Sequence, residues 1–191
     1  MAMKTRCKTR PWRRCLREAE GYLALATLFE DQQLSLDQAE KSVLADLCLK
    51  TLGQLGEAGR WRPRVLYLSG QAHRLACRYR QAISDLNLAW QRNACNVHTS
   101  LALGWCYKRT GQMEQAIDAL QNGLEVDGNS GILHYNLACY LALQDRSERA
   151  LIHLARAIEI DNRFRMLAGD EADFDSLRND PGFRELAEAV V

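Results

Sequence analysis

Apolar residues recur along this 191-residue chain with the spacing of amphipathic helices, and the pattern itself repeats. One such pattern begins at Ala82, continues through Leu86 and Ala89, and ends at Trp90, which is the i, i+4, i+7, i+8 spacing of one helical face. The same positions are again small or apolar 34 residues later, and once more after a further 34. The pattern therefore predicts helices that recur with a 34-residue period.

Three ungapped segments, 63–96, 97–130 and 131–164, carry this repeat. The columns that keep their character are Gly70, Gly104 and Ala138; Ala82, Ala116 and Ala150; Leu86, Leu120 and Leu154; and Ala89, Gly123 and Ala157. Polar or glycine-containing breaks divide the segments into helices. One helical hairpin cannot bury its own apolar face, so the units are expected to stack.

This period resembles that of the tetratricopeptide-repeat family. The second segment matches best and has the family's residues at Gly104, Tyr107, Gly111 and Ala116. The first has His73 and Cys77 in place of the family's Tyr and turn Gly, and no segment has the closing Pro. The resemblance implies an all-α fold, a right-handed superhelical solenoid of antiparallel helix pairs with a short helical C-terminal cap.

The predicted organisation extends beyond the three repeats on both sides. The expected parts are a basic arm at 1–12, a diverged helical pair at 13–58, three repeats at 63–164, and an acidic capping tail with short helices at 165–191. Amphipathic stretches at 13–29 and 36–55 form the diverged pair, with Ala39 and Val43 taken as core residues of its second helix. The arm is interpreted as a solubilising segment, with a functional tether as the alternative.

In this family the first helices of the pairs line a concave groove, and the resemblance implies which residues face it. The groove positions are Arg64, Tyr67, Gln71 and Arg74 in the first repeat; His98, Leu101, Trp105, Lys108 and Arg109 in the second; and Ile132, Tyr135, Asn136 and Cys139 in the third. Aromatic residues beside cations suit a peptide with an apolar anchor and acidic flanks. The alternative is that Trp105 and Tyr135 only pack between repeats. A chaperone-type carboxylate clamp is not expected, because only Asn136 fits its pattern.

The charge distribution supports a second hypothesis. The net charge is +1, yet residues 60–110 hold nine Lys or Arg against the single acid Asp85. The alternative function is therefore a nucleic-acid-associated adaptor that uses this basic stretch. Arg80 and Arg92 fall on second helices or turns, outside the groove, which disfavours it. We expect a non-enzymatic scaffold or adaptor that binds a protein or peptide.

Candidate chemistry elsewhere is sparse. His73 with Cys77, and Cys95 with His98, have spacings that place two ligands on one helical face, but structural zinc takes four. No P-loop, dinucleotide fingerprint or HExxH motif occurs. The seven cysteines are scattered without a CxxC pair, which favours reduced thiols in a cytoplasmic protein. The longest mostly apolar run, 22–29, is far shorter than the roughly 18 residues of a membrane span. We expect no metal, no cofactor, no membrane span and no catalysis.

Overall fold

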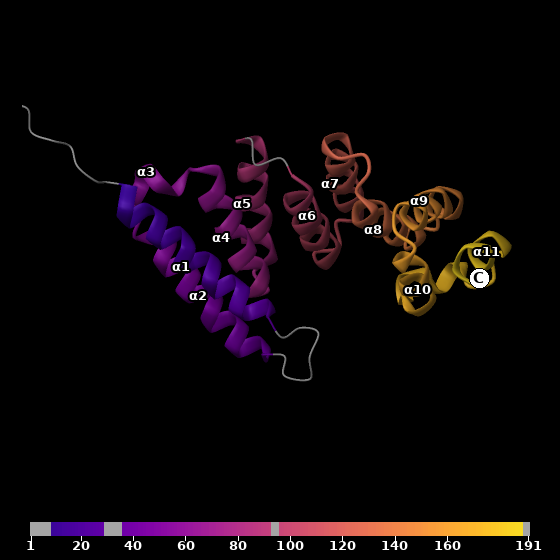
Figure 1. Cartoon of the computed structure of the whole chain (residues 1–191), viewed down its shortest axis with the longest axis horizontal. Coiled ribbons are helices and arrows are strands. Elements are labelled where there is room, and N and C mark those ends of the chain that lie inside the picture. Colours follow the sequence, from indigo (N-terminus) through magenta and orange to yellow (C-terminus); the bar gives the residue numbers. More distant parts are fainter. Residues whose placement is uncertain (1–8, 29–35, 93–95, 189–191) are drawn as a thin grey trace, which may run out of the picture. The chain divides into compact units, whose positions relative to one another are not determined.

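The structure is a computed structural model that describes residues 9–28, 36–92 and 96–188. Within these ranges every regular element is a helix (Figure 1). The chain divides into two compact units, Met1–Ala94 (unit 1) and Cys95–Val191 (unit 2). The division falls at the end of the first predicted repeat, and each unit is described by itself. Most of the predicted basic arm, residues 1–8, lies outside the described residues.

Unit 1 consists of two helical pairs and a short connecting helix. Its elements are α1 (Thr9–Thr27), α2 (Gln38–Gly53), α3 (Gly56–Arg60), α4 (Pro63–Leu75) and α5 (Tyr79–Gln91). The helix α1 pairs with α2, α4 pairs with α5, and α2 and α4 join the two pairs. A capping box starts α2, because Glu40 N donates to Asp37 Oδ1 (2.8 Å) and Asp37 N donates to Glu40 Oε2 (2.9 Å). Pro63 stands in the first turn of α4, where its missing N–H costs nothing.

The core face of α2 differs from the predicted one. Ala39 is exposed and Val43 is 60% exposed, so these residues do not enter the core. The buried face is instead formed by Ala45, Cys48 and Leu52, which pack with residues of α1 and α4. The prediction was wrong because the insertion before the first repeat removes the 34-residue register that aligns the other helices.

The turn inside each predicted repeat has the same backbone geometry. Cys77, Gly111 and Asp145 occupy the same column, and all have a left-handed φ, of 57°, 75° and 55°. In each turn the next residue's N–H reaches back five residues, as from Gln112 N to Tyr107 O (2.9 Å). The sequence difference at this column therefore does not change the turn, although only glycine adopts this φ without strain.

Unit 2 continues the pairwise arrangement and ends in three short helices. Its elements are α6 (Val97–Arg109), α7 (Met113–Val126), α8 (Gly131–Ala142), α9 (Ser147–Ile160), α10 (Arg163–Asp170), the 3₁₀ helix η1 (Ala172–Leu177) and α11 (Pro181–Glu188). The helix α6 pairs with α7, α8 pairs with α9, and α7 packs on α8. A Cβ atom at Gly104 would lie 3.0 Å from Leu120 Cδ2, so the small-residue column permits close packing of α6 on α7.

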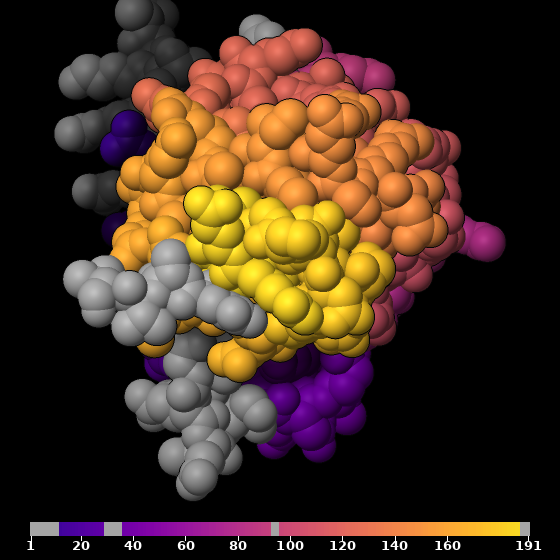
Figure 2. All heavy atoms as spheres, turned by 90° about the vertical axis from the view of Figure 1, so that its right-hand side faces the viewer, coloured from indigo at the N-terminus to yellow at the C-terminus, as the bar shows by residue number. Residues whose placement is uncertain are grey.

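The remaining repeat columns are also core positions. Ala82, Ala116 and Ala150 are fully buried, as are Leu86, Leu120 and Leu154. This confirms the assignment of both columns to the helix contacts. Part of the core of unit 2 comes from the C-terminal elements, which contribute Ala168, Phe174, Leu177 and Phe183. In Figure 2 these yellow elements lie directly against the orange part of the same unit. Among the described residues, no helix has the length and apolar character needed to cross a membrane.

Candidate functional site

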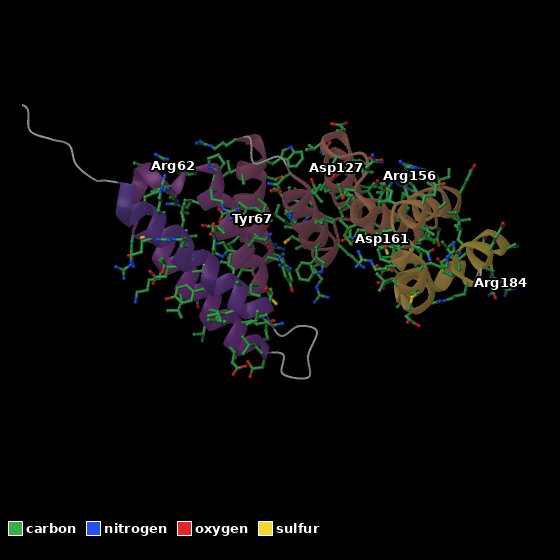
Figure 3. The ribbon with its side chains drawn as sticks, in the orientation of Figure 1. Arg62, Tyr67, Asp127, Arg156, Asp161 and Arg184 are labelled. Carbon is green, nitrogen blue, oxygen red and sulfur yellow. The ribbon has the colours of Figure 1, made fainter. Side chains whose placement is uncertain are left out.

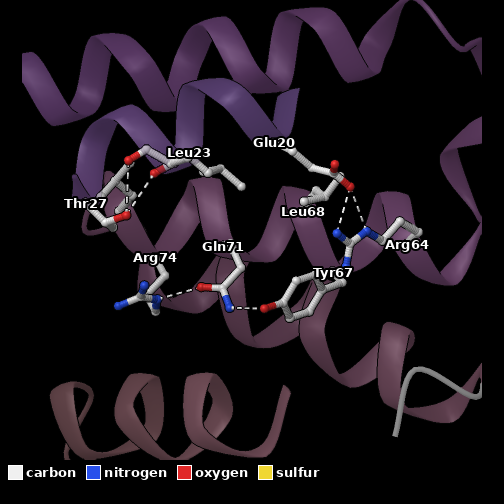
Figure 4. A pocket seen from close by; sticks show the side chains of 10 residues that line it. Glu20, Leu23, Thr27, Arg64, Tyr67, Leu68, Gln71 and Arg74 are labelled. Carbon is white, nitrogen blue, oxygen red and sulfur yellow. Dashed lines mark hydrogen bonds and ion pairs between the residues drawn. The ribbon is translucent and has the colours of Figure 1, made fainter. Parts of the chain in front are cut away.

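A cavity in unit 1 gathers the predicted groove residues of the first repeat. It has a volume of about 320 Å³ and lies between α1 and α4 (Figure 4). All four groove positions that the sequence assigned to α4 line it: Arg64, Tyr67, Gln71 and Arg74. The same cavity is lined from α1 by Glu20, Leu23, Ala24 and Thr27. The cavity therefore has one wall of predicted groove residues on α4 and a second wall on α1, whose residues were not predicted.

Hydrogen bonds link the polar groups of this cavity in a row along α4. Arg74 Nε donates to Gln71 Oε1 (2.8 Å), and Gln71 Nε2 donates to Tyr67 Oη (3.0 Å). Tyr67, labelled in Figure 3, and Arg74 are seven residues apart, which is about two helical turns, so Gln71 bridges them (Figure 4). The row links the Tyr67 hydroxyl through Gln71 to the Arg74 guanidinium at the cavity.

An ion pair closes one end of the cavity. The Arg64 guanidinium donates through Nε (3.0 Å) and Nη2 (2.7 Å) to Glu20 Oε1 on α1, and its Cζ atom lies 5.5 Å from the centre of the Tyr67 ring. Between the polar ends the wall is apolar, formed by Leu23, Leu68 and Leu75. The cavity therefore presents an apolar floor and an aromatic ring, with cations at both ends and one carboxylate that is already paired.

The groove positions of unit 2 divide into two groups, and in the first the side chains remain accessible. His98 and Arg109 are exposed, and Leu101 and Trp105 are partly buried. The Arg109 guanidinium carbon lies 5.6 Å from the Trp105 ring centre, which is a cation–π distance. In the third repeat Ile132 is 40% exposed, and the Asn136 amide donates to the Ile132 carbonyl (2.8 Å).

The second group is covered by the chain's own C-terminal elements. Tyr135 is only 7% exposed and lies between Phe164, stacked at 5.0 Å, and Phe174, edge-on at 5.9 Å. Lys108 forms an ion pair with Asp173, and Cys139 is buried. The prediction that these three side chains face an open groove therefore does not describe this structure. The family register places them on the correct face but does not include the segment that returns across it.

A second cavity of unit 1 lies away from the groove positions. It has a volume of about 680 Å³ and is bounded by residues of α2 to α5, including Trp61, Ser69 and Ser84. Within it His73 Nε2 lies 3.6 Å from Asp85 Oδ2. Burial lowers the pKa of His73 and raises that of Asp85, so desolvation disfavours the charged form of both. No groove position from the family register lines this cavity.

The basic stretch that suggested nucleic-acid binding is largely engaged within unit 1. Arg60 contacts Glu57 (4.0 Å) and lies over the Trp61 ring, and Arg62 lies over Trp12 (Figure 3). Arg78 pairs with Asp46 of α2 at 2.7 Å. These contacts place the cations beside internal acids and rings. Such contacts within unit 1 compete with phosphate for these cations, which disfavours the nucleic-acid hypothesis.

The cysteines that the structure describes are mostly packing residues. Cys15, Cys48, Cys106 and Cys139 are buried and Cys77 is exposed, all as free thiols, whereas Cys7 and Cys95 lie outside the described residues. Burial raises the pKa of Cys48 to about 12, so this thiol does not ionise at neutral pH. Within the described ranges no three His, Cys, Asp or Glu residues gather as a metal site would require.

Comparisons with known proteins agree on the class. Residues 97–130, the second predicted repeat, match the family model described as tetratricopeptide repeat. The chain is similar to a crystal structure of MamA at 16% identity and a TM-score of 0.66, over 81% of this chain and 91% of that one. It is also similar to YrrB, described as a TPR protein with an unusual peptide-binding site, at 18% identity and a TM-score of 0.56, over 93% of this chain and 87% of that one.

The chain therefore carries a tetratricopeptide repeat at residues 97–130 and has an all-α fold of helix pairs, as the 34-residue period had predicted. At these identities the solved structures establish the fold alone. A comparison with curated protein sequences gave no match.

Proposed function

We propose that the protein is a non-enzymatic scaffold that binds a peptide segment of a partner protein in the cavity between α1 and α4. The observation that supports this most directly is the coincidence of two independent results. The family register assigned Arg64, Tyr67, Gln71 and Arg74 to a peptide groove, and these four residues line one hollow of suitable size. YrrB, another protein of this fold, is described as having an unusual peptide-binding site.

The chemistry of the cavity suits recognition better than catalysis. An aromatic ring and aliphatic floor provide apolar contact area, and arginines beside them add directed hydrogen bonds. Aromatic and arginine side chains on rigid elements carry most of the binding energy at protein interfaces. The hydrogen-bonded row from Tyr67 to Arg74 reduces the cost of binding, because those side chains are already ordered.

Selection from an unbiased peptide library on the full chain tests this proposal. Selected peptides should lose at least roughly tenfold in affinity when Tyr67→Ala is introduced. Tyr79→Ala is the matched control, because Tyr79 is a partly buried tyrosine on α5, outside this cavity. Helical content from circular dichroism should be the same in both variants.

Trp105→Ala extends the test to the accessible groove positions of unit 2. A selected peptide whose affinity falls with this variant and not with Tyr67→Ala would bind to unit 2 by itself. If Tyr67→Ala binds every selected peptide as tightly as wild type, the cavity between α1 and α4 is not the binding site and the proposal is refuted.

A further inference from the structure

The face of unit 2 formed by the first helices α6 and α8 already holds a short acidic segment of the same chain. Residues 171–177 (called the C-terminal segment below) run along η1 and pack on α8. Phe174 is fully buried and meets Tyr135 of α8 edge-on. The neighbouring Asp173 accepts a hydrogen bond from Lys108 of α6. Aromatic and acidic side chains thus enter this face together.

The acidic character of the segment extends to both sides of Phe174. Glu171 and Asp173 precede it, and Asp175 follows it. Burial raises the pKa of Cys139 on α8, and the nearby charges of Asp173 and Glu171 raise it further. The segment therefore has the chemistry that the groove positions predicted for a partner, namely an apolar anchor between acids.

In unit 1 the corresponding face is open. The helices α1 and α4 are consecutive first helices in contact, as α6 and α8 are in unit 2, and the 320 Å³ cavity lies between them. Tyr67 is at the same repeat position as Tyr135, but it is partly exposed where Tyr135 is buried. Arg74 likewise has the repeat position of Lys108. In unit 1 the cation Arg74 is on the same helix as Tyr67, whereas in unit 2 Lys108 is on α6, the first helix of the repeat before that of Tyr135.

We infer that the open face of unit 1 binds a linear peptide that resembles the C-terminal segment, an aromatic residue flanked by carboxylates. This inference rests on the proposed function and specifies its ligand. The aromatic side chain enters between Leu23, Leu68 and Leu75, next to the Tyr67 ring. A flanking carboxylate meets the Arg74 guanidinium, for which a two-pronged hydrogen bond is the favoured geometry.

Size and charge both favour this ligand over others. Small-molecule sites occupy about 300–1,000 Å³, so a cavity at the lower limit admits one or two side chains and not a folded surface. A basic peptide would meet Arg64 and Arg74.

The chain itself supplies the probe for the test. A fluorescently labelled peptide of residues 169–180 is titrated into the full-length protein, and anisotropy gives the dissociation constant. We expect saturable binding that weakens at least tenfold with Tyr67→Ala or Arg74→Gln and is unchanged with Tyr79→Ala. Peptides carrying Phe174→Ala, or Asp173→Asn with Asp175→Asn, should each bind at least tenfold more weakly.

Amide hydrogen exchange locates the bound peptide. Added protection should appear in α1 and α4. Protection confined to unit 2, with loss of binding in Lys108→Gln and not in Tyr67→Ala, would mean that the peptide only exchanges with the C-terminal segment, and the inference would be overturned.

Failure of this inference is distinguishable from failure of the proposed function. If the peptide does not bind while library-selected peptides of other chemistry bind in a Tyr67-dependent manner, the ligand class is wrong and the groove remains the binding site. If neither class of peptide depends on Tyr67, both proposals are wrong.

Discussion

Removal of the Phe174 side chain is the perturbation whose effect on unit 2 follows most directly from the structure. The ring is fully buried, lies edge-on to Tyr135 at 5.9 Å and is tilted against Phe183 at 5.5 Å. Phe→Ala substitutions at such positions cost about 3–5 kcal/mol, because apolar transfer energy is lost and a cavity remains. The two aromatic contacts, worth about 0.5–1.5 kcal/mol each beyond their area, place the expected cost in the upper part of that range.

Thermal unfolding and amide hydrogen exchange measure this cost. For a unit of this size 1 kcal/mol corresponds to about 4–8 °C in Tm, so a loss of about 3 kcal/mol lowers the Tm of unit 2 by about 12 °C or more. Exchange resolves the two units even if their transitions overlap, and lost protection should concentrate in α8, α10 and η1. The same variant should make Tyr135 accessible to solvent, and its near-ultraviolet absorption should shift to shorter wavelength.

Met166→Ala is the control, since this side chain of α10 is 78% exposed and its loss should change stability by less than about 0.5 kcal/mol. A Phe174→Ala protein within about 1 kcal/mol of wild type would refute the reasoning. It would mean that the C-terminal elements are not part of the cooperative core of unit 2.

Three further predictions concern stability. Ala116→Leu should lose roughly 1–3 kcal/mol in urea denaturation, because Ala116 is fully buried at the contact of α6 with α7; an unchanged midpoint would contradict the predicted register. Cys77→Gly should gain up to about 1 kcal/mol by relieving a left-handed φ of 57°, whereas Cys77→Ala, which keeps the strain, should not. His153, whose pKa burial and the nearby His134 lower to about 4, binds a proton more weakly in the folded than in the unfolded state. Stability should therefore decline as pH falls from about 6.5 towards 4. The expected loss is roughly 1 kcal/mol, because solvent reaches His134 and His153 and screens their interaction. His153→Gln should remove this dependence of stability on pH.

The repeat could be predicted from the sequence because its cause is local. A helix-contact column must be small or apolar in every copy, so Gly70, Gly104 and Ala138 reveal the period without any tertiary information. Likewise, the groove positions on α4 depend only on helical periodicity and on which helix comes first in its pair. The structure places Tyr67, Gln71 and Arg74 on one cavity for that reason.

The other wall of the cavity could not be predicted in this way. Glu20 and Leu23 come from α1, which lies outside the 34-residue register because an insertion separates it from the repeats. The core residues of α2 were misassigned for the same cause. Where the period is interrupted, only the packing of the helices decides which face is buried.

The period, the helix pairs, their apolar faces and the class of the fold follow from the sequence, since all of these repeat along the chain. Tertiary structure alone decided which groove positions remain open. The C-terminal segment has no counterpart in the repeat, and it returns over α8 because Phe174 gains burial against Tyr135 and Asp173 gains an ion pair with Lys108. Contacts between residues so distant in sequence follow no local period. They make the groove face of α8 part of the core of unit 2, whereas the groove face of unit 1 stays accessible.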